Sequence, residues 1–163
     1  MKTIRYTAER VLDFAWFADK RFLVQIGDTT LKSGKKVETY TYFSKKHAAT
    51  WSKSNFYAKR AVAFYSQHVG EYPHPQASAV MSDEGFGGGM EYPMITVLSG
   101  DFTDRQLDET ITHEVGHNWF QGILASNERE HPWLDEGLNS YYDSSCVSDS
   151  VFESCGTRLR HYC

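Results

Sequence analysis

One helix constrains the fold of this chain more than any other part of the sequence, and it is predicted over residues 103–121. Thr103 and Gln106 have the spacing of a capping box, which begins a helix, and Gly122 follows where the helix should end. Apolar side chains recur every four residues along one side, at Leu107, Ile111, Val115 and Trp119. Because such a stripe must be buried, the chain should pack a core against this helix.

The segment His113-Glu114-Val115-Gly116-His117 lies in the same helix, and its histidines and glutamate fall away from the apolar stripe. Positions i and i+4 lie about one turn apart on one face of a helix, so both imidazoles can reach a single ion. Two histidines in this arrangement, with a glutamate after the first, are typical of a zinc site in which the glutamate polarises a metal-bound water. The sequence therefore predicts one Zn²⁺ ion per chain, with Glu114 beside it.

A catalytic zinc site needs three protein ligands and one open position, so a third ligand must come from a nearby element. Glu136 is the natural candidate, in a second helix that is predicted over residues 133–142. Eighteen residues separate Glu136 from His117, which leaves room for a loop that brings the two helices antiparallel. The alternative pattern HExxHxxGxxH is excluded, because Phe120 and Ile123 occupy the positions of its glycine and third histidine.

A glycine-rich segment lies upstream, and Gly88-Gly89-Met90-Glu91 is its most informative part. Taken alone, the glycines indicate a flexible turn, and no P-loop lysine follows them. A carboxylate beside open backbone and near a zinc site could hold the free α-ammonium group of a peptide. Glu91 is therefore a candidate for substrate binding, with Gly88, Gly89 and Met90 beside it.

The rest of the chain predicts an α+β fold in which a small mixed sheet packs on helices. A long helix is expected over residues 46–69, with a buried side made of Trp51, Phe56, Ala63 and Phe64. Gly27-Asp28 is a turn signal. Alternating or short apolar runs predict strands at residues 22–26, 37–43, 77–81 and 94–98. We expect the zinc in a groove below the edge strand, with the loop that carries Glu91 along that edge.

Composition and charge are those of an ordinary folded domain. Hydrophobic residues make up 40% of the 163 residues, which argues against disorder. The net charge of -4, without a basic patch, gives no reason to expect nucleic acid as a partner. No apolar run is long enough to span a membrane, and residues 1–6 do not begin a signal peptide. These properties leave the cellular compartment open.

Three cysteines lie near the end of the sequence, at Cys146, Cys155 and Cys163. An odd number of cysteines without a CxxC pair is not typical of a disulfide framework. We interpret them as plain thiols, and the alternative is a second zinc site that includes His161.

Three linked motifs together resemble the aminopeptidase N family of zinc peptidases, which are gluzincins. They are Gly88-Gly89-Met90-Glu91, the HExxH segment with His117-Asn118-Trp119-Phe120 after it, and Trp133-Leu134-Asp135-Glu136-Gly137. The stretch Asp13-Phe14-Ala15-Trp16 is similar to the point where the family's N-terminal β-domain meets its catalytic domain. The likeness covers roughly residues 5 to 143.

The resemblance implies a thermolysin-like catalytic core that removes residues from the N-terminus of peptides. Three side chains would bind the zinc ion: His113, His117 and Glu136. Glu114 would act as general base and then as proton donor. Glu91 would hold the free N-terminus of the substrate, which makes the family exopeptidases. The backbone of Gly88 and Gly89 would line the cleft beside the scissile peptide.

The sequence departs from the family pattern in three ways. Tyr92 and Asp135 stand where many members have asparagine, which affects fine specificity. The family's oxyanion-stabilising tyrosine lies some tens of residues beyond the third zinc ligand, and Tyr141, Tyr142 and Tyr162 are too close or too weakly supported for that role. Most of the β-domain and the whole C-terminal helical domain have no counterpart in this sequence.

These departures predict an incomplete catalytic domain. We expect residues 1–14 to be the end of an N-terminal β-domain, residues 15–143 to be the peptidase domain, and residues 144–163 to be a weakly specified tail. Three functions are then possible: an active aminopeptidase core, a zinc-binding but catalytically incompetent fragment, and a thermolysin-type endopeptidase, which Glu91 disfavours. Apolar surface left without its neighbouring domains should also favour self-association.

Overall fold

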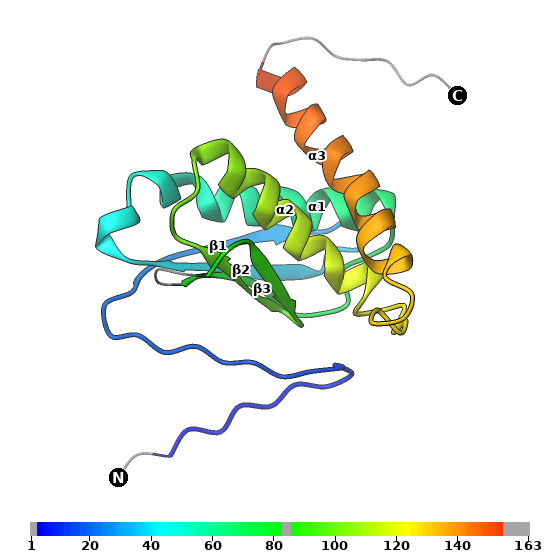
Figure 1. The fold of residues 1–163 in the computed structure, drawn as a ribbon, viewed down its shortest axis with the longest axis horizontal. Coiled ribbons are helices and arrows are strands. Elements are labelled where there is room, and N and C mark those ends of the chain that lie inside the picture. Colours follow the sequence, from blue (N-terminus) through cyan, green and yellow to red (C-terminus); the bar gives the residue numbers. More distant parts are fainter. Residues whose placement is uncertain (1–2, 83–85, 155–163) are drawn as a thin grey trace.

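The computed structural model describes residues 3–82 and 86–154, and in this part of the chain five strands form one sheet with helices on one face (Figure 1). The strands are β1 (Leu23–Thr30), β2 (Lys36–Phe43), β3 (Gln76–Ser82), β4 (Gly89–Tyr92) and β5 (Ile95–Ser99). Their order is β1-β2-β3-β5-β4. The outer pairs, β1–β2 and β4–β5, are antiparallel, and the inner pairs are parallel. The predicted α+β fold with a small mixed sheet is confirmed.

The turn expected at Gly27-Asp28 is wrong, because β1 continues through both residues. Glycine at position 27 instead lets the side chain of Asn55 lie close to β1, because a Cβ atom there would meet Oδ1 of Asn55 at 2.3 Å. The chain reverses after β1 over residues 31–35, where Gly34 has a φ of +90°. Glycine adopts this left-handed conformation at little cost, so the turn forms there.

The segment that carries Glu91 is a strand rather than a loop. It forms β4, the edge strand of the described sheet, and Glu91 lies opposite Thr96 of β5 in the ladder. The expected place of this segment along the sheet edge is therefore correct, but its expected conformation is wrong. Backbone pairing with β5 holds Glu91 more rigidly than a glycine-rich loop would.

The helices of the described residues are α1 (Ser54–His68), α2 (Asp104–Phe120) and α3 (Leu138–Ser154). Two 3₁₀ turns, η1 (Lys45–His47) and η2 (Thr50–Lys53), precede α1, and a π-helical turn, η3 (Trp133–Gly137), precedes α3. The predicted capping box of α2 is present, because Thr103 and Gln106 bond each other's backbone N–H groups. α3 continues past Tyr142, where the second helix was expected to end.

The helix expected from residue 46 is divided, and its buried side differs from the prediction. Trp51 is buried on η2 as expected, but Phe56 is 57% exposed and Ala63 is also exposed. A 3₁₀ turn has three residues per turn rather than 3.6, so the phase counted from Trp51 does not continue into α1. The buried side of the last turns of α1 is made by Ala61, Val62 and Tyr65.

The core lies between the sheet and helices α1 and α2. The predicted apolar stripe of α2 is buried in full: Leu107, Ile111, Val115 and Trp119. Tyr65 of α1 stacks on Trp119, with 5.1 Å between the ring centroids. These contacts fix α2 along its length and leave its other side for His113, Glu114 and His117. In the described part of the chain, no helix combines the length and the apolar character that crossing a membrane requires.

The face of the sheet that carries no helix is only partly covered. Residues 3–22, without strand or helix, run past it as an extended segment (Figure 1). A cavity of about 920 Å³ separates this segment from the sheet, with Phe14 on one wall and Val80 on the other. Trp16 of the segment and Ile26 of β1 remain exposed.

Candidate metal centre

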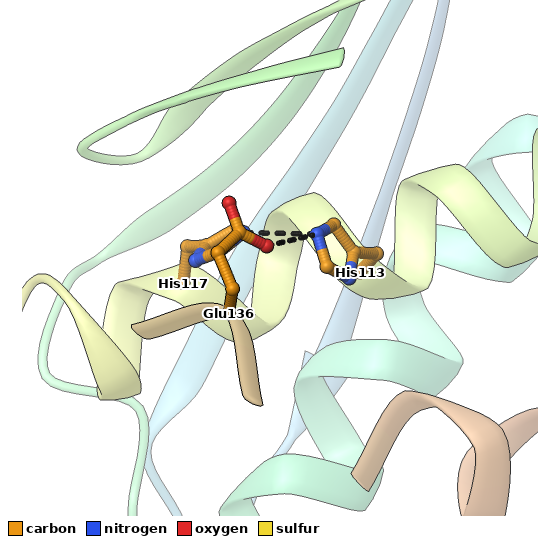
Figure 2. A group of neighbouring side chains, drawn as sticks. All are labelled: His113, His117 and Glu136. Carbon is orange, nitrogen blue, oxygen red and sulfur yellow. Dashed lines mark hydrogen bonds and ion pairs between the residues drawn. The ribbon is translucent and has the colours of Figure 1, made fainter. Parts of the chain in front are cut away.

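The three predicted zinc ligands converge, because His113 and His117 project from α2 toward Glu136 of η3 (Figure 2). The Nε2 atoms of the two histidines lie 3.1 Å apart. Oε2 of Glu136 lies 3.3 Å from Nε2 of His113 and 3.8 Å from Nε2 of His117. Residues separated by a long loop in the sequence thus meet around one point.

This donor set fits a zinc ion in both its distances and its chemistry. A tetrahedral ion with bonds of about 2.0–2.1 Å to its ligands holds neighbouring donor atoms about 3.3 Å apart. The three spacings between His113, His117 and Glu136 scatter around that value. Two unprotonated Nε2 atoms in contact would set their lone pairs against each other, and a cation between them removes that repulsion.

Each imidazole is oriented by a carboxylate on its other side. Nδ1 of His113 lies 2.7 Å from Oδ2 of Asp143, and Nδ1 of His117 lies 2.5 Å from Oδ1 of Asp135. An ionised carboxylate only accepts hydrogen bonds, so both Nδ1 atoms carry the proton and both Nε2 atoms present a lone pair to the centre. Sequence reasoning missed both carboxylates, although Asp143 stands two helical turns after Glu136 on the same side.

The neighbours Asp135 and Glu136 approach His117 from different directions. Asp135 is buried behind Nδ1, whereas Glu136 is half exposed and faces Nε2. Both residues belong to the π-helical turn η3. Within it, the backbone N–H of Glu136 donates to the carbonyl of Pro132 at 2.7 Å. Such turns are rare and occur often at functional sites, and this one carries Glu136, the predicted third ligand.

The two histidines differ in their ionisation. Burial would lower the pKa of His113, but the hydrogen bond with Asp143 and the charge of Glu114 outweigh it and raise this pKa above its ordinary value. Burial and the neighbouring His113 lower the pKa of His117. The neutral form, which binds a metal, is therefore favoured more strongly at His117 than at His113.

Glu114 lies beside the donor set and is only 5% exposed. Its Oε2 atom has no hydrogen-bond partner among the residues that the structure describes. Burial raises the pKa of Glu114 to about 8, against the opposing effect of His113. A Cβ atom at Gly89 would meet Oε1 of Glu114 at 2.1 Å, so glycine lets β4 lie directly against this carboxylate. A buried, unbonded carboxylate oxygen in this place can accept a proton from water.

Strand β4 brings Glu91 to the same centre. Donor atoms of Glu91, Glu114 and His117 all lie within 4.8 Å of one another, as do carboxylate oxygens of Glu91, Glu128 and Asp135. Burial raises the pKa of Glu91. Several carboxylates therefore share a partly buried space in which a cationic group would be stabilised. Sequence reasoning missed Glu128, which lies in the loop after α2.

The rest of the predicted substrate segment lies beside the centre, in β4 and just before it. Gly88 has a φ of +95°, a left-handed conformation that suits glycine, and Met90 belongs to β4. The hairpin is tied to α2 because Oδ1 of Asn118 accepts a hydrogen bond from the backbone N–H of Met94 at 3.0 Å. This bond keeps the segment at a fixed distance from the donor set.

The alternative zinc site among the cysteines stays a prediction. Cys146 is buried in α3. Cys155, His161 and Cys163 lie outside the described residues, as does Tyr162.

Comparisons with known proteins agree with this architecture. The profile of the Peptidase family M1 domain matches residues 54–160. The relatives include leucine aminopeptidase 2 of Pyricularia oryzae, 36% identical over 66 residues, and that of Yarrowia lipolytica, 37% identical over 77 residues. These matches cover 37% and 46% of this chain, but only 10% and 11% of the relatives. The chain thus spans about a tenth of their length.

A solved structure has the same fold. The crystal structure of Legionella pneumophila aminopeptidase A in complex with aspartic acid matches with a TM-score of 0.65. The match covers 78% of this chain and 16% of that chain, at 14% sequence identity.

Proposed function

The chain belongs to peptidase family M1, and we propose that it carries a zinc-dependent aminopeptidase site, which hydrolyses the N-terminal bond of peptides. The observation that carries this proposal is the convergence of His113, His117 and Glu136, with Glu114 and Glu91 beside them. The names of the curated relatives, leucine aminopeptidase 2, support the same activity.

We propose that His113, His117 and Glu136 hold the zinc ion. When bound in such a site, zinc lowers the pKa of a water molecule and polarises the carbonyl under attack. Asp135 and Asp143 keep the two imidazoles in the required tautomer and orientation.

Glu114 would take a proton from the attacking water and pass it to the leaving amine. A carboxylate can accept a proton and release it again, and an oxygen of Glu114 lies within 4.8 Å of a ring nitrogen of His117. The Oε2 atom of Glu114 is buried and unbonded among the described residues, so water would find an acceptor there. Gly89 keeps the carboxylate in this position.

Glu91 and Glu128 would bind the free α-ammonium group of the substrate. A peptide with a blocked amine would leave these carboxylates without a cationic partner, which is a strong basis for rejection. β4 is the edge strand of the described sheet, so an extended peptide could pair with its backbone. The substrate would then run along β4 with its amino end at Glu91.

A zinc-binding but catalytically incompetent chain is the second candidate. It is favoured by the surroundings of the tyrosines that follow Glu136 in the described part: Tyr141 is exposed, and Tyr142 stacks on Phe120 in the helical core. Neither arrangement supports a role at the metal centre. Loss of one oxyanion donor typically lowers turnover about 10²–10³-fold.

The test uses the full chain with an aminoacyl anilide and its N-acetylated counterpart. We expect cleavage of the free-amine substrate alone. Glu114→Gln should lower this rate about 10²–10⁴-fold while the zinc content stays at one ion per chain. Glu109→Gln is the matched control, because Glu109 is partly exposed on the same helix and bonds Arg105 instead.

Other outcomes separate the alternatives. Bound zinc without turnover in the unaltered chain would favour the incompetent fragment. Equal cleavage of both anilides would contradict the role of Glu91, and cleavage of internally labelled, N-blocked peptides would indicate an endopeptidase. Activity that survives Glu114→Gln would come from a contaminant or from another mechanism.

A further inference from the structure

Asn139 is a fully buried side chain near the metal centre, and the proposed mechanism does not use it. It lies in the first turn of α3, three residues after Glu136. Nδ2 of Asn139 donates to the backbone carbonyl of His113 at 2.7 Å, and Oδ1 accepts from Oη of Tyr65 at 3.0 Å. The Asn139 amide therefore joins α1, α2 and α3, and its contact on α2 is the backbone of His113, a proposed zinc ligand.

The hydrogen bonds allow only one orientation of this amide. With the amide flipped, Oδ1 of Asn139 would face the carbonyl oxygen of His113 at 2.7 Å, acceptor against acceptor. In the observed orientation the carbonyl receives a second donor in addition to its bond within the helix. The position of His113 is thus set by α3 as well as by its own helix.

The Asn139 amide packs against α2 at Gly116, where the absence of a side chain leaves room for it. A Cβ atom at Gly116 would meet Oδ1 of Asn139 at 1.9 Å and Oη of Tyr65 at 2.4 Å. Because only glycine leaves this space, α3 can approach α2 closely one residue before His117. The close approach is therefore centred on the metal-binding turn of α2.

Asn139 and Asp143 lie four residues apart on one side of α3, and both contact His113. Asn139 holds the backbone of His113, while Asp143 bonds its ring at Nδ1. Glu136 lies just before the same helix. The placement of α3 against α2 therefore fixes two things at once: where Glu136 meets the histidines and how the His113 ring is turned.

We propose that Asn139 is a positioning residue that sets the zinc affinity, by holding α3, with Glu136 and Asp143, in register with His113. This inference rests on the proposed function, because it requires His113 to be a zinc ligand. Loss of a partner that supports a ligand typically lowers metal affinity by about 10–100-fold. We expect a loss of that size when the amide is removed.

The experiment measures the zinc dissociation constant of the full chain by competition with a chromophoric chelator. Asn139→Ala should bind zinc about 10–100-fold more weakly. Asn139→Asp, nearly equal in shape, should also bind more weakly because an ionised carboxylate cannot donate to the carbonyl of His113. A simple effect of charge has the opposite sign, since an added negative charge attracts Zn²⁺.

Asn55→Ala is the matched control for lost stability. Asn55 is also buried, and its Nδ2 donates to the backbone carbonyl of Thr39 at 3.0 Å, joining α1 to β2 away from the metal centre. This variant should unfold more easily but keep the zinc dissociation constant. Tyr65→Phe keeps the ring that stacks on Trp119 and removes only the donor to Asn139, so we expect an intermediate loss of affinity.

The outcomes distinguish this inference from the function on which it rests. An unchanged dissociation constant in Asn139→Ala, or a change no larger than that in Asn55→Ala, would overturn the positioning role and leave the zinc site intact. Tighter binding by Asn139→Asp would overturn it too. An unaltered chain that binds no zinc would overturn the proposed site itself, and the role of Asn139 with it.

Discussion

At the scale of single residues, the position of the Glu114 carboxylate depends on Gly89, a residue without a side chain. A Cβ atom at Gly89 would lie 2.1 Å from Oε1, 2.4 Å from Cδ and 2.7 Å from Cγ of Glu114. Because the clash involves the stem of the side chain as well as its end, Gly89→Ala should displace the whole carboxylate. We expect the hydrolysis rate of an aminoacyl anilide to fall about 10²-fold, with the zinc dissociation constant unchanged.

Gly87→Ala is the control for this prediction. Gly87 belongs to the same glycine-rich segment, but a Cβ atom there would have nothing within 4 Å. Its activity should match that of the unaltered chain. Equal losses in the two variants would show that the flexibility of the segment matters, rather than the position of Glu114.

The sequence predicts the proposed zinc ligands better than the residues that hold these ligands in place. His113 and His117 are recognisable because the i, i+4 spacing on a helix places two rings on one face. Asp135 and Asp143 act across a helix–helix contact, and no spacing rule connects them to α2. The role of Asn139 could not be predicted for the same reason, because its partners lie on two other helices.

At the scale of elements, the packing of the three helices depends on Gly116. A Cβ atom there would enter the space of Asn139 and Tyr65, both of which are fully buried. Alanine favours a helix by about 1 kcal/mol over glycine, but overpacking a buried contact costs about 1–3 kcal/mol. With two buried groups in the way, we expect Gly116→Ala to lower the free energy of unfolding in urea.

Gly137→Ala provides the comparison. The nearest atom to a Cβ at Gly137 is Cβ of Trp133 at 3.9 Å, an ordinary contact. The free energy of unfolding should then stay equal to that of the unaltered chain or rise by up to about 1 kcal/mol, the helical preference of alanine. A Gly116→Ala chain as stable as this control would mean that α3 can shift away from α2 without loss.

Elements with local signals were predictable, and elements that depend on pairing were not. α2 has its capping box, its apolar stripe and a glycine after its end, and its bounds follow from these. β4 is a short strand that begins with glycine and exists because β5 pairs with it. The buried face of α1 was missed because the 3₁₀ turn η2 precedes it and shifts the helical phase.

At the scale of the whole molecule, a bound ion would link two parts of the chain that are far apart in the sequence. His113 and His117 belong to α2, and Glu136 belongs to η3. A ligand that binds only the folded state at about 100 times its dissociation constant adds about 2.7 kcal/mol of stability. For a chain of this size, the midpoint of thermal unfolding should rise by roughly 5–11 °C on addition of zinc.

Glu136→Ala tests whether this gain comes from the proposed site. Glu136 is half exposed, so its loss should leave the unfolding midpoint of the metal-free chain almost unchanged. The rise on addition of zinc should become much smaller. An equal rise in both chains would place the stabilising ion elsewhere.

The open face of the sheet predicts how the molecule behaves at high concentration. β1 is an edge strand of the described sheet, and Ile26 on it is 72% exposed, close to the partly covered face beneath residues 3–22. Exposed apolar edge strands pair readily with other copies, and a lysine on the edge opposes such pairing. Sedimentation velocity should therefore show reversible self-association that increases with concentration, and Ile26→Lys should weaken it.

Phe56→Lys is the control, at an exposed apolar position on α1, and it should leave the self-association unchanged. Equal effects of the two lysines would indicate unspecific apolar contact, and a monomer at every concentration would contradict the prediction.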